Sequence, residues 1–459
     1  METQTGIPKT ERKAMLRQAI NLAWPSAIEG ALLSIISSVD TMMVKTVGPN
    51  AIASVSLTAQ PRLILLIIAQ ALCVGTTALV ARRKGEGDQA SANSVLAQSM
   101  ALITVLGVII SLVGVFFAEP IMDLAGADAD TREYSVAYFR IIAAGLCFNC
   151  WNLCICAALR AVGNTRITMV TNITANLVNV FLNYCLIGGN LGFPKLGVEG
   201  AAIATVVGTG VACAISFGVI MHRGGFLYWR PGIPKFDRKT LSGLARVGIS
   251  SMAESAFLRI GFFLNTKLVA GVDYLALTGY TIVQQVTGLS FTLGDGGATA
   301  GATLVGQSLG ARNKERAKGY VALCRVMSLV ISIGLMILIF FLRDQLGALF
   351  TDDPGVIAGA SAAFLVVIVA MISQNARVVY SGCLRGAGDV TYVAVCSLVS
   401  VAILRPALTW VFLYVLNDRF PEAMFPYTGP WIAFAIDAVV RQLMLFFRVK
   451  KGKYLDVKL

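Results

Sequence analysis

The sequence predicts an all-α membrane protein in which twelve transmembrane helices form two pseudo-symmetric six-helix bundles. Three observations lead to this prediction: the composition is apolar, the apolar residues gather into long segments, and the second half of the chain repeats the first. Of the 459 residues, 56% are hydrophobic and only 14% are charged, and the mean hydropathy is +0.73. Ordinary soluble proteins carry about 25% charged residues, so this composition indicates an integral membrane protein.

Twelve apolar segments follow one another with short connections. Each is long enough for the ~20 residues that a helix needs to cross the hydrocarbon core. In chain order they are residues 20–43, 51–80, 95–118, 133–158, 166–188, 197–221, 241–270, 275–306, 317–341, 356–382, 390–415 and 426–448. The first apolar run follows a polar N-terminus and lacks a small-residue cleavage site, so we expect the first helix to stay in the membrane.

The net charge of +13 comes from basic residues in alternate connections. Basic clusters precede the first segment and occupy residues 82–84, 223–239, 312–318 and 448–453, whereas the other connections are acidic or neutral. Because basic loops stay in the cytoplasm, we expect a multi-pass protein of the bacterial cytoplasmic (plasma) membrane with both termini cytoplasmic. The basic charge is then a topology signal, and no nucleic-acid partner is expected.

Ten cysteines and one histidine leave little material for metal or histidine-based chemistry. Nearly all the cysteines fall inside apolar segments, including the four in "CFNCWNLCIC", and we interpret them as small apolar residues at helix contacts. His222 lies in a basic connection. We expect no catalytic residues, no enzymatic activity and no cofactor apart from a coupling ion.

An internal repeat with an offset of 225 residues relates the two halves. "ALRAVGNT" matches "CLRGAGDV" and places Arg160 over Arg385. "AIEGALL" matches "MAESAFL" and places Glu29 over Glu254. The agreement of separate stretches on one offset indicates a duplication.

The repeat predicts an N-terminal six-helix lobe over residues 1–225, a basic cytoplasmic linker over 226–240 and a C-terminal lobe over 241–459. Each lobe begins and ends on the cytoplasmic side, so the repeats are parallel and related by an axis along the membrane normal. This arrangement is typical of transporters that rock two bundles about a central cavity.

Apart from acids in the first three residues of a segment, five acidic residues lie within the apolar segments, where a carboxylate costs about 2.5–3.5 kcal/mol on insertion scales and is a functional candidate by default. They are Glu29, Asp40, Glu254, Asp295 and Asp437. Glu29 and Asp40 are eleven residues apart, which puts them on one helix face, roughly 16 Å apart along the axis.

Segment 166–188 carries four asparagines on one helix face, spaced by 4, 3 and 4 residues. They are Asn172, Asn176, Asn179 and Asn183. Such asparagines can hold neighbouring membrane helices together, or they can complete the oxygen shell of a cation bound at Asp40.

The second half of the repeat lacks both features of this predicted cation site. Asp40 maps to Asn265, and the four asparagines map to Ser397, Val401, Leu404 and Leu408. A joint loss is easier to understand if the asparagines and Asp40 form one site, in the N-terminal lobe only.

Arginines also occur within the apolar regions. Those singled out are Arg62, Arg140, Arg259, Arg377 and Arg405. We interpret most of them as partners of carboxylates on neighbouring helices, and substrate contact is the alternative.

Several motifs together resemble the multidrug and toxic compound extrusion (MATE) transporters, in particular the bacterial NorM/DinF-like branch. They are "SVDTMMVKTVGPNAIA", "ALRAVGNTRITM", "LVNVFLNYCLIGGNLGFPKLGVEGAAIAT" and "CLRGAGDV". The resemblance covers essentially the whole chain. It implies a MATE-like fold of two six-helix lobes and export of organic cations and drugs, driven by uptake of Na⁺ or H⁺.

The resemblance also implies roles for individual residues. The cation-coupling candidates are Asp40, Asn179, Asn183, Thr205 and Glu254, with Na⁺ possible at Asp40, Asn179 and Asn183. The candidates for the substrate cavity are Glu29, Asn149, Asn172, Asn176, Gln285, Gln374 and Arg377. Asn183 and Gln374 stand where relatives carry aspartate, and Glu29 has no counterpart among the family's known acids.

The main hypothesis is a cation-coupled antiporter that exports amphipathic, mostly cationic compounds by alternating access. Its expected partners are small organic molecules, a monovalent cation and membrane lipid, and the expected state is a monomer. The alternatives are a flippase for lipid-linked precursors, an exporter of an anionic metabolite, and an intramembrane enzyme. The enzyme would need a His–Asp or Ser–Lys cluster at helix ends, which the sequence does not show.

Overall fold

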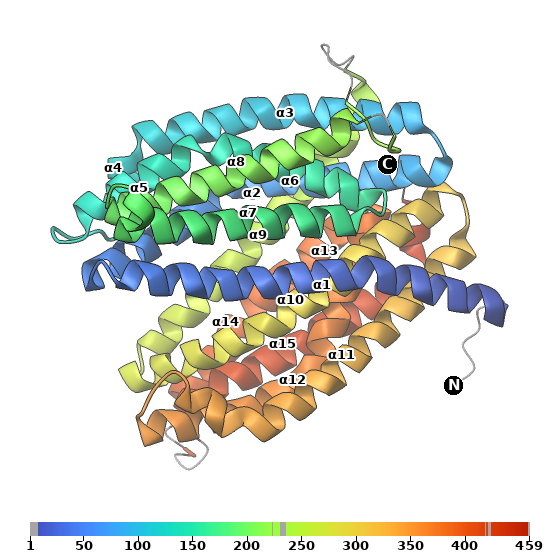
Figure 1. Ribbon diagram of the computed structural model, residues 1–459. Helices are drawn as coiled ribbons and strands as arrows, with labels where there is room; N and C mark the ends of the chain where they lie inside the picture. Colours follow the sequence, from blue (N-terminus) through green and yellow to red (C-terminus); the bar gives the residue numbers. More distant parts are fainter. Residues whose placement is uncertain (1–7, 223, 230–235, 418, 421–423, 458–459) are drawn as a thin grey trace. The chain divides into compact units, whose positions relative to one another are not determined.

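The computed structural model describes residues 8–457 except 223, 230–235, 418 and 421–423, and its described part is built from helices without a strand (Figure 1). The first half contains α1 (Lys9–Lys45), α2 (Pro49–Glu86), α3 (Gln89–Phe116), α4 (Ala118–Leu124), α5 (Arg132–Ala144), α6 (Leu146–Ala161), α7 (Thr165–Gly188) and α8 (Gly197–Met221), with a short 3₁₀ turn at Asn190–Gly192. This confirms the predicted all-α fold class.

The second half repeats the succession of long helices. It contains α9 (Arg238–Ala270), α10 (Tyr274–Gly310), α11 (Lys314–Ala348), α12 (Pro354–Ala387), α13 (Val390–Ser397), α14 (Arg405–Trp410) and α15 (Phe425–Lys450). Two π-helical stretches, Leu398–Leu404 and Val411–Leu416, join α13 and α14 into one span, and a 3₁₀ turn covers Lys453–Asp456.

The described helices are compatible with the predicted twelve spans. Nine are long and apolar enough to cross a membrane, and ten if α5 and α6, which meet at a 48° bend, count as one span. The remaining two segments correspond to α10 and α15, of 37 and 26 residues. Glycine, threonine and glutamine residues lower the hydropathy of α10.

Packing divides the chain into two compact units, Ile28–Gly248 and Met1–Ala27 with Ile249–Leu459. We call them the N-terminal unit and the C-terminal unit. They differ from the predicted lobes because helices pack across the repeat boundary. Met15 and Ala19 of α1 belong to a buried cluster of the C-terminal unit, and Leu244 of α9 packs on Gly75 of the N-terminal unit. The lobe boundaries stay a sequence prediction.

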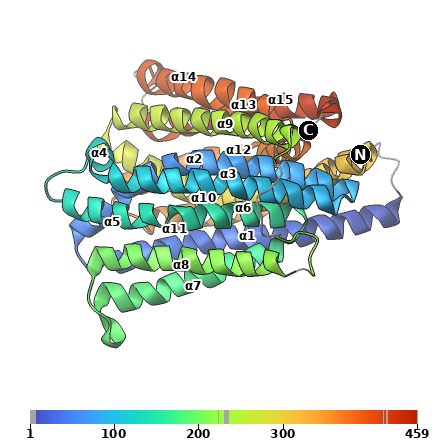
Figure 2. The same cartoon turned by 90° about the horizontal axis from the view of Figure 1, so that it is seen from above.

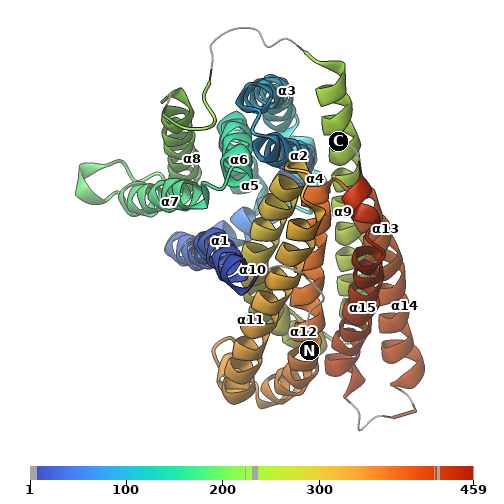
Figure 3. The same ribbon diagram turned by 90° about the vertical axis from the view of Figure 1, so that its right-hand side faces the viewer.

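In the N-terminal unit, α7 and α8 lie side by side (Figures 1 and 3). A Cβ on Gly208 of α8 would lie 2.8 Å from the carbonyl oxygen of Ala175 and 3.0 Å from Cβ of Asn179. Glycine at this position therefore brings α8 onto the asparagine face of α7.

In the C-terminal unit, α12 packs against α10, α11 and α15, and α14 runs along α15 (Figure 2). Small residues allow the close approach of α10 and α12, as is common between membrane helices. A Cβ on Gly382 would lie 2.4 Å from the carbonyl oxygen of Ala298, and one on Gly386 would lie 2.0 Å from that of Ala302.

Candidate functional site

The N-terminal unit encloses a cavity of about 710 Å³ among α1, α2, α5, α6, α7 and α8. Its size is within the ~300–1,000 Å³ range of small-molecule pockets. Its polar lining includes Glu29, Asp40, Arg62, Tyr138, Asn149, Asn152, Arg160, Asn172, Asn176, Asn179, Asn183, Thr205 and Thr209. Two acidic residues of α1 and the asparagine face of α7 thus border the same space.

One end of the polar lining surrounds Asp40. Asn183 Nδ2 donates to Asp40 Oδ1 at 2.8 Å and lies 3.4 Å from Asn179 Oδ1. Asn179 Nδ2 in turn donates to Thr205 Oγ1 of α8 at 3.3 Å. Four of the five sequence-predicted coupling residues, Asp40, Asn179, Asn183 and Thr205, therefore form one connected group from α1, α7 and α8.

The other end of the lining surrounds Glu29. Asn172 Nδ2 donates to Glu29 Oε1 at 2.6 Å, and Arg160 Nη1 lies 3.7 Å from the same oxygen. Asn152 Nδ2 of α6 donates to Asn172 Oδ1 at 3.1 Å. Asn172 and Asn183 have the same eleven-residue spacing as Glu29 and Asp40, so each carboxylate of α1 meets one asparagine of α7.

The asparagine face of α7 connects neighbouring helices, which is one of the two roles that the sequence left open, and it also contacts the two carboxylates of the cavity; the cation-binding role stays a prediction. Asn172 and Asn179 bond to residues of α6 and α8, which ties the helices together. Asn172 and Asn183 bond to the carboxylates. Asn176 lines the cavity, as does Asn149, and bonds to the backbone oxygen of Asn172 at 2.7 Å.

The fifth predicted coupling residue, Glu254, lies in the C-terminal unit and is 2% exposed. Arg385 donates to its two oxygens at 2.6 and 3.1 Å, and Arg441 donates at 3.2 Å. The structure therefore does not group Glu254 with Asp40. Two fixed guanidinium groups surround its carboxylate.

The arginines that the sequence singled out have different environments. Arg405 is buried and paired with the buried Asp437, as the pairing hypothesis predicted. Arg377 is also buried, and its guanidinium lies 5.2 Å from the centre of the Phe291 ring. Arg140 also pairs with a carboxylate on a neighbouring helix, Glu119 of α4 at 3.1 Å, as the hypothesis predicted, but its expected place inside an apolar region is wrong because it is exposed.

Sequence reasoning missed three arginines that contact intramembrane acids: Arg160, Arg385 and Arg441. The first two were visible as the conserved arginine of the repeat motif "LRxxG" and could have been proposed as partners of the equally repeated glutamates. Arg441 has no such signal.

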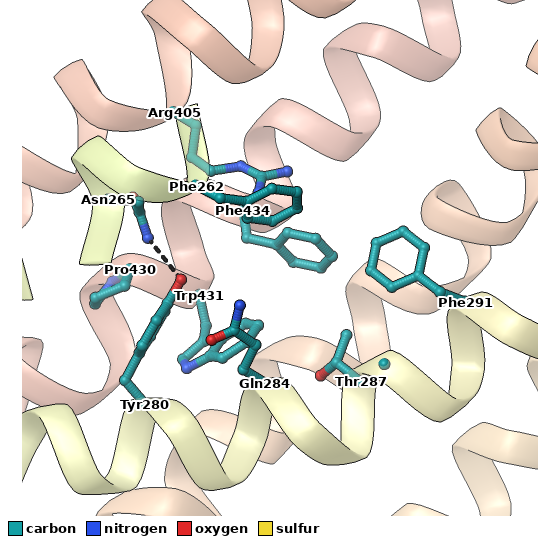
Figure 4. A pocket seen from close by; sticks show the side chains of 11 residues that line it. Phe262, Asn265, Tyr280, Gln284, Thr287, Phe291, Arg405, Pro430, Trp431 and Phe434 are labelled. Atoms are coloured by element: carbon teal, nitrogen blue, oxygen red, sulfur yellow. Dashed lines mark hydrogen bonds between the residues drawn. The ribbon is translucent and has the colours of Figure 1, made fainter. Parts of the chain in front are cut away.

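The C-terminal unit contains a smaller pocket of about 170 Å³ (Figure 4). Five aromatic side chains line it: Phe262, Tyr280, Phe291, Trp431 and Phe434. Asn265, the repeat counterpart of Asp40, donates to Tyr280 Oη at 3.1 Å and accepts a hydrogen bond from Thr409 at 2.6 Å. An amide held by two hydroxyl groups thus replaces the carboxylate site of the N-terminal unit.

The predicted substrate-cavity residues of the second half lie outside these two pockets. Gln285 is exposed, and the neighbouring Gln284 lines the aromatic pocket instead. Gln374 is fully buried, and neither its amide nitrogen nor its oxygen has a hydrogen-bond partner in the described part of the chain. Gln285, Gln374 and Arg377 line neither pocket.

A fold of long apolar helices around a polar intramembrane cavity defines a polytopic membrane transport protein. The chain belongs to the MatE family, whose model matches it twice, at residues 25–185 and 251–411. The double match also confirms the internal repeat.

Relatives and a solved structure agree with this assignment. The chain is 26% identical over 450 residues to a probable multidrug resistance protein NorM of Thermotoga maritima, covering 98% of this chain and 95% of that protein. It is 27% identical over 454 residues to the multidrug resistance protein PmpM of Pseudomonas aeruginosa, covering 96% and 92%. An outward-facing multidrug resistance MATE family transporter of the MOP superfamily matches with a TM-score of 0.88 and 21% identity, covering 97% of each chain.

Proposed function

We propose that this chain is an antiporter that takes up Na⁺ or H⁺ and exports amphipathic, mostly cationic organic compounds by alternating access. The observation that carries the proposal is the cavity of the N-terminal unit, in which the Asp40 carboxylate belongs to a hydrogen-bonded group of neutral asparagine and threonine side chains. The relatives named multidrug resistance proteins support organic compounds as the exported substrates. The protein would work in the cytoplasmic membrane with both termini inside.

The chemistry of the Asp40 group suits a monovalent cation. The Asn183 amide nitrogen donates to the Asp40 carboxylate, and the same hydrogen-bonded group contains the amide oxygens of Asn179 and Asn183 and the hydroxyl of Thr205. Hard cations prefer oxygen ligands, so a bound cation would be held by the carboxylate and these neutral oxygens after the Asn183 amide has turned. Asn183 Oδ1 is buried and has no hydrogen-bond partner among the described residues, so it is free to accept. A proton on Asp40 would neutralise the same charge without these ligands.

Coupling follows from the charge that the cation removes. An ionised Asp40 in the membrane favours conformations that keep it hydrated, whereas an occupied Asp40 tolerates closer helix packing. The cation shifts this equilibrium by its differential affinity for the two conformations. A substrate that prefers the other conformation is then coupled to the cation, and the coupling is reciprocal.

Asp40 is a better coupling candidate than Glu254. The Glu254 carboxylate is ion-paired with Arg385 and Arg441. Protonating this carboxylate would leave two guanidinium groups without their counter-ion, which is strongly unfavourable. We therefore assign Glu254 a structural role and place coupling in the N-terminal unit.

Ethidium efflux from cells that lack their own pumps tests the proposal. Wild type, Asp40→Asn and Glu254→Gln are compared at equal membrane expression, with and without Na⁺ and at two external pH values. We expect Asp40→Asn to lose ion-dependent efflux at least about tenfold, because the charge that binds the ion is gone. Glu254→Gln should keep the ion dependence of wild type per molecule of protein.

The ion that stimulates wild-type efflux identifies the coupling cation. Undiminished, ion-dependent efflux by Asp40→Asn would refute coupling at Asp40. Loss of ion dependence in Glu254→Gln alone would move the coupling site to the C-terminal unit.

A further inference from the structure

A glutamate–arginine pair occurs at equivalent repeat positions in both units. Glu29 aligns with Glu254, and Arg160 aligns with Arg385. In the C-terminal unit the two groups are 2.6 Å apart, and in the N-terminal unit they are 3.7 Å apart. The pair is therefore duplicated, but it is tight in one unit and loose in the other.

A second motif aligns α8, the last helix of the first half of the chain, with α15, the last long helix of the second half. "GAAIAT" in α8 matches "GPWIAF" in α15, which places Gly200 over Gly429. A Cβ on Gly200 would lie 2.7 Å from the carbonyl oxygen of Leu186, and one on Gly429 would lie 2.8 Å from Cβ of Phe412, so each glycine packs on the helical segment that precedes it. The offset of this motif is 229 residues, four more than the offset of the earlier motifs. Continuing along the helices, this alignment places Ala212 over Arg441.

The two aligned residues of α8 and α15 differ, and this changes the surroundings of the two glutamates. Arg441 donates to Glu254 at 3.2 Å and to Ser397 at 2.6 Å, and it is buried. Ala212 has only a methyl group, and it lines the same cavity as Glu29. Glu254 is thus bound by two guanidinium groups, whereas one guanidinium lies near Glu29.

The hydrogen bonds of Glu29 reflect this difference. Its Oε1 accepts from Asn172 at 2.6 Å, with Arg160 close to the same oxygen. Glu29 as a whole is only 6% exposed. Its Oε2 is buried and has no hydrogen-bond partner among the described residues. A buried carboxylate oxygen without a donor is unfavourable, and this one belongs to a residue that borders the cavity.

We infer that Glu29 binds an N–H-bearing cationic group of the exported compound, such as an amidinium, guanidinium or primary ammonium group. This group takes the role on Glu29 that the Arg441 guanidinium has on Glu254. Because Arg160 already offsets the charge of Glu29, hydrogen bonding to Oε2 distinguishes ligands more than charge alone does. The inference rests on the proposed export function and specifies its substrate class.

A cation bound at Glu29 would also repel a cation bound at Asp40. The two carboxylates are roughly 16 Å apart along α1. At this distance a cation on Asp40 weakens binding of a monovalent cation at Glu29 about five- to sixfold at an effective dielectric constant near 20. The same factor applies in reverse, as an exchange of ion for substrate requires.

Equilibrium binding to the purified full-length protein in nanodiscs tests the inference without relying on transport. The probes are the fluorescent diamidine DAPI, which has N–H donors, and tetraphenylphosphonium, a cation that has none. Glu29→Gln keeps the shape of the side chain and removes its charge. Glu199→Gln, the same substitution at an exposed site of α8, is the matched control.

We expect Glu29→Gln to weaken DAPI binding about 10- to 100-fold, the value of a hydrogen bond to a charged group. Tetraphenylphosphonium binding should weaken much less than DAPI binding, because this probe loses only the attraction of the Glu29 charge and no hydrogen bond, and Glu199→Gln should bind both probes like wild type. Ala212→Arg, which transfers the C-terminal arrangement to Glu29, should abolish DAPI binding.

Equal DAPI affinity in wild type and Glu29→Gln, or no DAPI binding by wild type, would overturn the inference and leave ion-coupled efflux standing. Equal losses for both probes would also overturn it, because charge alone would then explain binding. If DAPI binding depends on Glu29 but wild type shows no ion-dependent efflux, the proposed antiport is wrong and the binding site remains.

Discussion

Replacing Arg405 by methionine is expected to destabilise the protein by about 3–5 kcal/mol, the cost of leaving a buried charge without its partner. Arg405 donates through Nε and Nη2 to Oδ2 of Asp437, and the two side chains are 3% and 0% exposed. The guanidinium also lies 5.2 Å from the Phe262 ring and 4.9 Å from the Phe434 ring. Methionine keeps most of the contacts with these rings, so the lost charge dominates the effect.

The free energy of unfolding of the purified protein, measured by SDS titration with circular dichroism, checks this value. The double variant Arg405→Met/Asp437→Asn removes both charges and should recover most of the loss, because a neutral buried pair carries no uncompensated charge. Wild-type stability in Arg405→Met would refute the reasoning. A double variant no more stable than the single one would show that packing, rather than charge, holds this part of the C-terminal unit.

Two further predictions concern the ion site and helix packing. Asn183→Ala should weaken Na⁺ binding about tenfold in a titration of Na⁺-dependent efflux, because it removes one neutral oxygen ligand. Unchanged Na⁺ affinity would exclude Asn183 as a ligand. Gly386→Ala should destabilise the protein by about 1–3 kcal/mol or more, because its Cβ would overlap the carbonyl oxygen of Ala302. Gly334→Ala is the control for SDS unfolding, since nothing lies within 4 Å of its Cβ, and equal stability of the two variants would contradict the packing argument.

Part of the candidate site could be predicted from the sequence. The spacing of Asn172 and Asn183 matches that of Glu29 and Asp40, so helical geometry alone predicted two polar faces with the same period. The structure brings these faces together, with hydrogen bonds of 2.6 and 2.8 Å. Local periodicity was sufficient here because all four residues belong to two continuous helices, α1 and α7.

The partners of Glu254 could not be predicted in the same way. Arg385 and Arg441 are 131 and 187 residues away along the chain, and only the packing of three helices brings them to one carboxylate. The repeat motif pointed to Arg385 as a partner of Glu254, but no spacing in the sequence pointed to Arg441. The prediction that Glu254 takes part in coupling therefore rested on resemblance, and its surroundings favour a structural role.

The sequence by itself determined that this chain crosses the membrane many times, that its halves are duplicates and that acids lie inside its helices. Hydropathy, loop charge and repeat spacing are local properties, and they are readable without a fold. Only the tertiary structure decided which buried carboxylates have their charge and hydrogen bonds matched by neighbouring side chains. Glu29 and Glu254 have the same repeat position and an equivalent arginine partner, yet α15 brings a second guanidinium to Glu254, whereas Glu29 borders an open cavity. The free energy of a buried charge depends on the groups around it, and helix packing determines those groups.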